Sequence, residues 1–396
     1  MTEPKKKTKP ETAECSPSER LFRVIGGIST DLITEAEHSV PVRRIKKVKK
    51  WLAPACAAAA CLLLFVGIGF WDGNHAGKLD VITIDSRWNT SEGAIGEPEW
   101  AKNADELYRD VPYDESMPLE SMPVFKRKYY IDRDTLQYVS YDTAAMKRQL
   151  AEYLNMLGTD PNTVSIKLEN YLGEPVEKID AADSIGRMYA ETDRFTINVY
   201  ADLDGIVTFK EPISLPSEYD LSTCASYEDT QKAADYITDN YSSWLGFEDP
   251  RVNLEKVDYE IEGRQFYNIT FYEGKSDYKE NLVSSNTGKV VIYINENGQI
   301  DAIRYCPENA LENVGEYPLI SPEEASKQAE AEGAEDIQKI FLGYNREMAG
   351  DEYMLPCYFV VSEYHSPDSP EYFPGQKEFI TYCIPAVTSE YLKKVK

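Results

Sequence analysis

The longest apolar stretch of the chain is residues 51–71 (WLAPACAAAACLLLFVGIGFW), which contain no Asp, Glu, Lys, Arg or His. At about 1.5 Å per residue, a helix of this length spans the roughly 30 Å hydrocarbon core of a bilayer. Six Lys/Arg side chains lie in the eight residues before it, and the region after it is acidic. This asymmetry predicts one transmembrane helix, with residues 1–50 in the cytoplasm and residues 72–396 outside the cell.

Three other interpretations of this stretch fit less well. A cleaved signal peptide would follow a short basic segment, whereas some fifty residues precede the stretch and no small-x-small site follows Phe70. A lipid-modified Cys61 should end the apolar run, but the run continues to Phe70. A buried core helix would not carry so many flanking charges. The pattern therefore favours an uncleaved single-pass protein of the cell membrane, in contact with lipid.

Beyond a proline-punctuated extracytoplasmic stalk over residues 72–121, the pattern becomes that of a globular α+β region. Helices are predicted near residues 143–157 and 227–245, where apolar side chains recur every three or four positions and a glycine follows. An Asp-Pro dipeptide and then alternating, strand-like runs follow each helix. The helix ends lie 88 residues apart. This spacing predicts two related modules of one helix and an antiparallel sheet.

Turn signals support the same repeat. Asp204-Gly205 and Asn297-Gly298 are two-residue hairpin signals between strand runs. A third unit starts at Ser321, which can cap a helix with a proline at its first position. The predicted fold class is α+β, one transmembrane helix followed by an extracytoplasmic region of repeated helix-plus-antiparallel-sheet modules. The modules are predicted over residues 122–220, 221–318 and 319–396.

The cytoplasmic tail contains a short amphipathic docking segment, residues 21–37. Two short helical pieces cannot bury its apolar side chains by themselves, so we interpret it as a helix-in-groove contact with a cytoplasmic partner. The alternative is an amphipathic segment on the membrane surface. The carboxylates of Asp31, Glu35 and Glu37 weigh against that alternative. The predicted partner-binding residues are Leu21, Phe22, Ile25, Ile28, Leu32 and Ile33.

The run IGGISTDLITEAE (residues 25–37), with the basic and apolar stretches that follow it, resembles part of certain Firmicutes membrane proteins. These proteins are often encoded with extracytoplasmic-function sigma factors and are treated as anti-sigma factors. The chain lacks the zinc-binding His/Cys pattern of the best-defined anti-sigma domains. The resemblance implies that the tail binds a cytoplasmic regulatory protein.

Two further resemblances concern the outer region. The order of a helix followed by hairpins resembles PepSY-like modules. In the last module, the runs SPEEA, FLGY, LPCYFVVSE and IPAV resemble the C-terminal part of YycH/YycI-type regulators, which modulate a membrane sensor kinase. Where that family commonly has an aliphatic residue after its proline, this chain has Cys357. The resemblance implies a sensor kinase as the regulated partner.

Charge narrows the choice of partners. The net charge is −26, but residues 1–50 carry 12 basic and 7 acidic side chains, whereas the 325 residues from 72 onward carry 30 basic and 61 acidic ones. An exterior this acidic repels phosphate backbones, so nucleic acid is not an expected partner. An extracytoplasmic protein or peptide ligand remains compatible with it.

The sequence contains no catalytic, cofactor or metal motif that we can assign. There is no G-x-S-x-G, H-E-x-x-H, P-loop or dinucleotide-binding glycine pattern, and the chain has three histidines. The seven cysteines form no C-x-x-C pair. Cys357 and Cys383 lie in two strand-like runs that could face each other across a hairpin, and the sequence leaves open whether they form a disulfide.

The predicted function is that of a non-catalytic bitopic signalling regulator. In this hypothesis the tail holds a sigma factor or a sensor kinase, and the outer region senses a ligand or partner. The alternative is a membrane-anchored extracytoplasmic binding or protease-inhibitory module with an inert tail.

Overall fold

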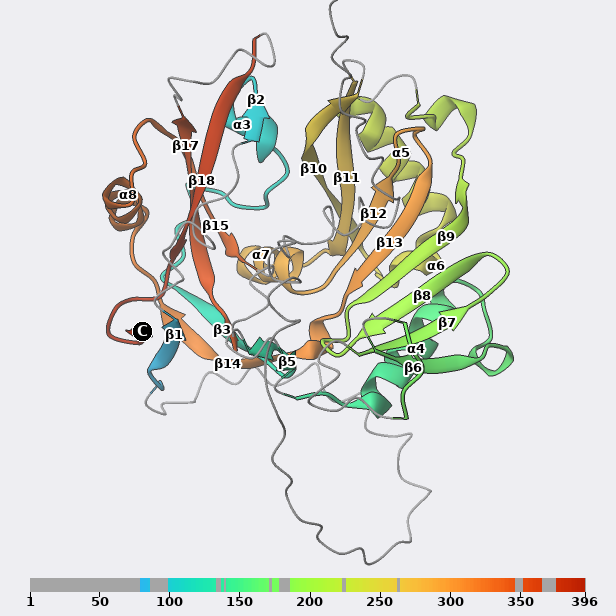
Figure 1. Ribbon diagram of the computed structural model, residues 1–396. Helices are drawn as coiled ribbons and strands as arrows, with labels where there is room; N and C mark the ends of the chain where they lie inside the picture. The colour runs from blue at the N-terminus through green and yellow to red at the C-terminus, as the bar shows by residue number, and fades with distance from the viewer. Residues whose placement is uncertain are drawn as a thin grey trace, which may run out of the picture. The chain divides into compact units, whose positions relative to one another are not determined.

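Antiparallel strands dominate the described residues of the computed structural model (Figure 1). The chain separates into two units, residues 1–77 and 78–396, and only the second contains described residues. The structure describes residues 79–85, 99–132, 137–138, 140–170, 173–177, 186–222, 226–261, 264–345, 352–364 and 375–395.

The structure corrects the predicted fold class. Six α-helices occur in the described residues, and none of them is long and apolar enough to cross a membrane. The longest, α4 (Thr143–Met156) and α5 (Tyr227–Asn240), have 14 residues each and would extend only about 21 Å at 1.5 Å per residue. The predicted span, residues 51–71, lies outside the described residues. The described residues thus contain no transmembrane helix, against the predictions of one transmembrane helix, a single-pass protein and a cell-membrane localisation.

One eight-stranded antiparallel sheet forms the larger part of the described unit, in the order β10-β11-β12-β13-β9-β8-β7-β6. Its apolar side chains on one face form the main hydrophobic core together with α4, α5 and α6 (Ser242–Leu245). We call this sheet and these helices the first lobe. The strands are β6 (Ile166–Glu169), β7 (Arg187–Glu191), β8 (Phe195–Tyr200), β9 (Gly205–Ile213), β10 (Pro250–Ile261), β11 (Arg264–Glu273), β12 (Lys289–Ile294) and β13 (Ile300–Cys306).

The sheet consists of two four-stranded meanders. One is β6 to β9 and follows α4, and the other is β10 to β13 and follows α5, with α7 (Tyr278–Thr287) inserted between β11 and β12. The last strands of the two meanders, β9 and β13, pair antiparallel, and this pairing joins the meanders. Segments from the predicted modules 122–220 and 221–318 therefore share one sheet and one core.

Local sequence explains where the helices begin. The Asp142 side chain accepts hydrogen bonds from the backbone N–H groups of Ala144 and Ala145 and caps α4. The Ser226 side chain accepts one from the backbone N–H of Asp229 and caps α5. The apolar side chains of both helices then lie against the sheet, including the fully buried Leu154 and Ile237.

The two predicted hairpins differ in their turns. Gly298 adopts φ 71°, but Asn297 has no positive φ and five residues separate β12 from β13, so the connection is longer than the predicted two-residue turn. In the other hairpin the left-handed residue is Leu203, with φ 70°, and Gly205 is already the first residue of β9. The Leu203 side chain is only 4% exposed, so its burial in the core offsets the steric cost of this backbone conformation.

The second lobe is built from two smaller sheets and α8 (Pro322–Ala331). Ser321 caps α8, and Pro322 occupies its first position, as predicted. The strand orders are β14-β3-β16 and β15-β17-β18-β2. The strands are β2 (Glu99–Ala101), β3 (Ser121–Arg127), β14 (Leu311–Pro318), β15 (Ile337–Tyr344), β16 (Tyr353–Met354), β17 (Pro356–Tyr364) and β18 (Lys377–Pro385).

Two short strand pairs complete the described unit. β1 (Ile82–Asp85) and β19 (Leu392–Val395) pair in parallel, so the first and last strands of the described unit lie side by side. Ile82 and Ile84 are buried in a small core with Val124 and Tyr317 of the second lobe. A separate pair consists of β4 (Ile131–Asp132) and β5 (Gln137–Tyr138).

Candidate functional site

Helix α7 joins the two lobes. Its chain leaves the first lobe after β11 and returns to it as β12, and the Asp277 side chain caps it by accepting from the backbone N–H of Glu280 at 3.0 Å. Leu282 is fully buried, and its partners are core residues of the second lobe, among them Met122 and Leu342. The helix therefore belongs to the first lobe by connectivity and to the second by packing.

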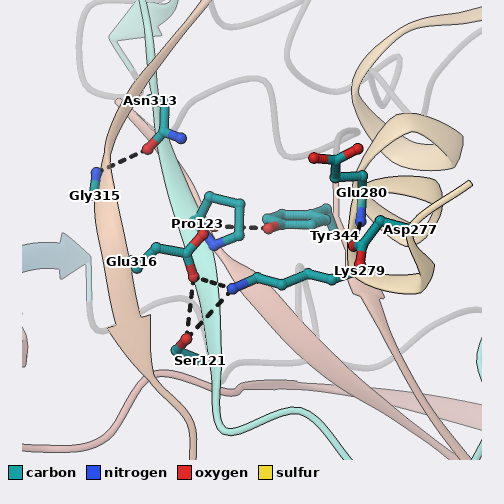
Figure 2. A network of polar contacts seen from close by, with 9 residues as sticks. All are labelled: Ser121, Pro123, Asp277, Lys279, Glu280, Asn313, Gly315, Glu316 and Tyr344. Carbon is teal, nitrogen blue, oxygen red and sulfur yellow. Dashed lines mark hydrogen bonds and ion pairs between the residues drawn. The ribbon is translucent and has the colours of Figure 1, made fainter. Parts of the chain in front are cut away.

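A polar network fixes the first turn of α7 to the second lobe (Figure 2). The Lys279 ammonium forms an ion pair with Oε2 of Glu316 on β14 and donates to the hydroxyl of Ser121 on β3 at 3.4 Å. The Ser121 hydroxyl donates to the same Glu316 oxygen at 3.1 Å. The Lys279 side chain is 22% exposed and that of Glu316 35% exposed, so water screens this ion pair only in part.

The same three side chains could suggest a serine–lysine catalytic pair, because a neutral lysine can accept the proton of a serine nucleophile. The geometry opposes this interpretation. Lys279 donates to Ser121, and both side chains direct their hydrogens to a carboxylate. The second oxygen of Glu316, Oε1, is buried and has no hydrogen-bond partner in the described residues. The arrangement is suited to holding three elements together rather than to activating a nucleophile.

Two tyrosines, one of them buried, reinforce this contact. The Tyr344 hydroxyl, on β15, donates to the carbonyl of Pro123 at 2.7 Å, as Figure 2 also shows. Burial raises the pKa of Tyr344 well above its ordinary value, so its hydroxyl stays protonated and remains a donor. At the start of α7, the backbone N–H of Asp114 donates to the Tyr278 hydroxyl at 2.8 Å.

Residues 99–115 form a second connection, which we call the strap. The strap contains β2, α3 (Ala104–Leu107) and Asp110. The Asp110 carboxylate accepts from the Tyr227 hydroxyl on α5 at 2.5 Å and from the backbone N–H of Leu254 on β10 at 2.9 Å. The Arg109 guanidinium lies 4.0 Å above the centre of the Tyr227 ring. The strap is thereby attached to the first lobe.

A buried lysine adds to the same attachment. The Lys256 side chain, on β10, is only 3% exposed and donates to the Trp100 carbonyl at 2.5 Å. One Glu106 oxygen lies 4.0 Å from its ammonium. A buried ammonium is costly unless it is paired, so these contacts favour one fixed position of the strap.

The other side of the strap is attached to the second lobe. β2 pairs with β18, and the Tyr108 hydroxyl lies 2.6 Å from that of Thr381 on β18. The Tyr108 ring contacts that of Phe341 on β15, with centroids 4.8 Å apart. The Lys339 ammonium pairs with Asp105 at 2.8 Å. The strap and α7 together form the junction, our candidate functional site.

The predicted partner-binding residues cannot be compared with this site. Leu21, Phe22, Ile25, Ile28, Leu32 and Ile33 lie outside the described residues. The same is true of the three histidines. Within the described ranges, no group of three or more His, Cys, Asp and Glu side chains could hold a metal ion.

Cys357 and Cys383 lie on the adjacent strands β17 and β18, and both are buried and in the thiol form. The strand register places Phe359, rather than Cys357, opposite Cys383. The two cysteines are therefore diagonal neighbours on one face of the sheet. The α-carbons of diagonal neighbours are about 7–8 Å apart, beyond the roughly 4.4–6.8 Å that a disulfide needs. The register therefore disfavours the disulfide that the sequence leaves open.

The junction was not anticipated from the sequence. Its residues lie in the predicted stalk and in all three predicted modules, without a periodic or motif signal. An Asp three residues before a Glu, as at Asp277 and Glu280, marks the start of α7, but nothing in the sequence pairs Lys279 with Glu316.

No protein-family model matches the chain, and a search of curated proteins finds no significant match.

Proposed function

We propose that the chain is a non-catalytic signalling regulator. In this proposal, residues 78–396 bind a protein or peptide ligand, and the N-terminal segment 21–37 binds a regulatory protein, a sigma factor or a sensor kinase. The observation that supports it best is the junction. Its polar side chains, which could otherwise take part in a reaction, bind one another and connect the two lobes.

Such a junction suits a protein that changes its conformation when it binds a ligand. Coupling between two binding events requires two conformations that differ in partner affinity, typically by about 1–3 kcal/mol. The ion pair of Lys279 and Glu316 and the hydrogen bonds of Asp110 are contacts that a ligand could strengthen or break at that energy. The resemblances of residues 25–37 and of the C-terminal runs to regulators favour a sigma factor or a sensor kinase over other partners.

A capture experiment in the native cells tests the proposal. The full chain and its Leu32→Asp/Ile33→Asp variant serve as cross-linked baits. We expect the native chain, and not the variant, to retain a sigma factor or a sensor kinase, because two carboxylates in the docking segment would have to be buried in an apolar groove. Both substitutions lie outside residues 78–396, so the thermal unfolding midpoint of that unit serves as a control.

Two outcomes would overturn the proposal. Equal capture by both baits would indicate that the segment is inert and would favour the alternative, a binding or inhibitory module that acts through residues 78–396 alone. A hydrolytic activity that Ser121→Ala abolishes would make the protein an enzyme.

A further inference from the structure

Four aromatic side chains form a continuous series on the first lobe, which we call the aromatic stripe: Tyr219, Tyr236, Tyr241 and Trp244. Tyr219 stacks on Tyr236 with ring centroids 4.5 Å apart. The Tyr236 and Tyr241 rings pack edge to face with centroids 6.2 Å apart, and the centroids of Tyr241 and Trp244 are 4.1 Å apart. The stripe extends from the turn Ser217–Tyr219 along the end of α5 to α6.

Residues of the main core pack against the stripe and hold its rings in place. The centroid of the Trp244 ring lies 5.7 Å from that of the buried Phe209 ring. The Phe209 centroid in turn lies 6.3 Å from that of the fully buried Phe195 ring. The four rings of the stripe are half-buried and pack against the main core. Each therefore has one side fixed by the core and an edge or face in contact with solvent, so binding a ligand there would cost little side-chain entropy.

Acidic residues are frequent in the segment that carries the stripe. Residues 211–250 contain nine acidic side chains and one basic one, Lys232, which pairs with Asp229 at 3.0 Å. Four of the acidic residues are within three positions of a stripe residue in the sequence. These four are exposed and form no ion pair with any described residue: Glu218, Asp220, Asp235 and Asp239.

We propose that the aromatic stripe binds an extended, proline-containing segment of another protein that carries Lys or Arg side chains. Rows of Tyr and Trp bind polyproline II segments, which lose little entropy on binding because they are already extended. The carboxylates near the stripe complement the positive charge of the Lys or Arg side chains. The same carboxylates would repel an acidic or phosphorylated segment. This surface lies apart from the junction, and the inference does not depend on the proposed function.

Titration of the full chain with a ten-residue Pro-Arg repeat peptide tests the inference. We expect binding that Tyr236→Ala weakens about tenfold or more, since aromatic anchors dominate such interfaces. Tyr141→Ala removes an exposed tyrosine outside the stripe and should leave the affinity unchanged. Because Tyr236→Ala could disturb α5, Asp235→Asn/Asp239→Asn provides a second test at exposed positions. It should weaken binding several-fold, whereas Glu312→Gln, an exposed position on β14, should not.

Charge and ligand class provide the remaining controls. Raising the ionic strength from about 0.05 to 0.5 M should weaken binding, because the Debye length falls well below about 10 Å. A Pro-Glu repeat should not bind. No binding of the Pro-Arg peptide, or equal binding by the native chain and Tyr236→Ala, would overturn the inference. So would tighter binding of a neutral oligosaccharide with the same dependence on Tyr236.

Discussion

The rings of Tyr153 and Tyr305 stack with their centroids 4.4 Å apart and their planes inclined by 16°, but only one of the two hydroxyls has a hydrogen-bond partner among the described residues. Tyr153, on α4, donates to the Leu203 carbonyl at 3.2 Å. The Tyr305 hydroxyl, on β13, is buried and has no hydrogen-bond partner in the described residues. Because α4 precedes the first meander and β13 ends the second, this pair helps to unite the two meanders in one core.

The difference between the two hydroxyls predicts that replacing each tyrosine by phenylalanine has opposite effects on the free energy of unfolding. A buried hydroxyl without a partner costs about 1–3 kcal/mol, so Tyr305→Phe should leave the free energy of unfolding unchanged or raise it by up to about 2 kcal/mol. Tyr153→Phe leaves a carbonyl unpaired and should lower it by about 1 kcal/mol. Urea unfolding of the two variants measures both values. A clear loss of stability in Tyr305→Phe would mean that its hydroxyl has a partner after all.

Gly205 is needed because the Tyr153 ring occupies the space beside it. A β-carbon on Gly205 would lie 2.4 Å and 2.7 Å from two ring carbons of Tyr153. We expect Gly205→Ala to lower the free energy of unfolding by about 1–3 kcal/mol through overpacking. Gly288→Ala is the control, since its β-carbon would meet Glu308 at 3.4 Å. Similar losses in the two variants would contradict the packing argument.

The strap should loosen when Asp110 loses one acceptor. Both Asp110 oxygens accept hydrogen bonds, and an asparagine would keep only one acceptor oxygen and lose the charge that strengthens both bonds. Asp110→Asn should therefore lower the free energy of unfolding by about 1–3 kcal/mol. It should also speed amide hydrogen exchange in residues 99–115. Asp105→Asn, whose exposed ion pair is worth less, should change stability by under about 1 kcal/mol. Unchanged exchange in Asp110→Asn would show that Asp110 does not hold the strap.

Buried tyrosines predict a loss of stability in alkali. Burial raises the pKa of Tyr293 and of Tyr358 from 10.0 to about 12. The unfolded chain releases these protons first, so the stabilisation is fully present below pH 10 and is lost as the pH rises towards 12. Urea unfolding across this range should show the decline, and Tyr358→Phe should reduce it. An identical decline in the variant would remove Tyr358 from this explanation.

Local sequence signals predicted α4, α5 and α8, but not α3 or α7. The helix expected near residues 143–157 is α4, and the one expected near 227–245 is α5 followed by α6. Each depends on a cap and on side chains three or four positions apart, which are close in sequence. The Asp-Gly signal misplaced one turn, because the burial of Leu203 outweighed the preference of glycine for positive φ.

Contacts between distant residues could not be predicted in the same way. β3 pairs with β14, nearly two hundred residues later, and β9 pairs with β13, so pairing crosses the predicted module boundaries. The junction depends on such contacts too, since Lys256 and Trp100 are 156 residues apart. Neither residue differs in its local sequence from an exposed lysine or an ordinary tryptophan, and only the fold brings them together.

The central claim is that the segment 21–37 binds a regulatory protein, and the affinity of that protein for the purified full chain tests it most directly. Isothermal titration would compare the native chain with Leu32→Asp/Ile33→Asp, using the sigma factor or sensor kinase that the native chain captures. We predict a loss of affinity of about 100-fold, corresponding to about 2.7 kcal/mol. Equal affinity for the two chains would contradict the claim.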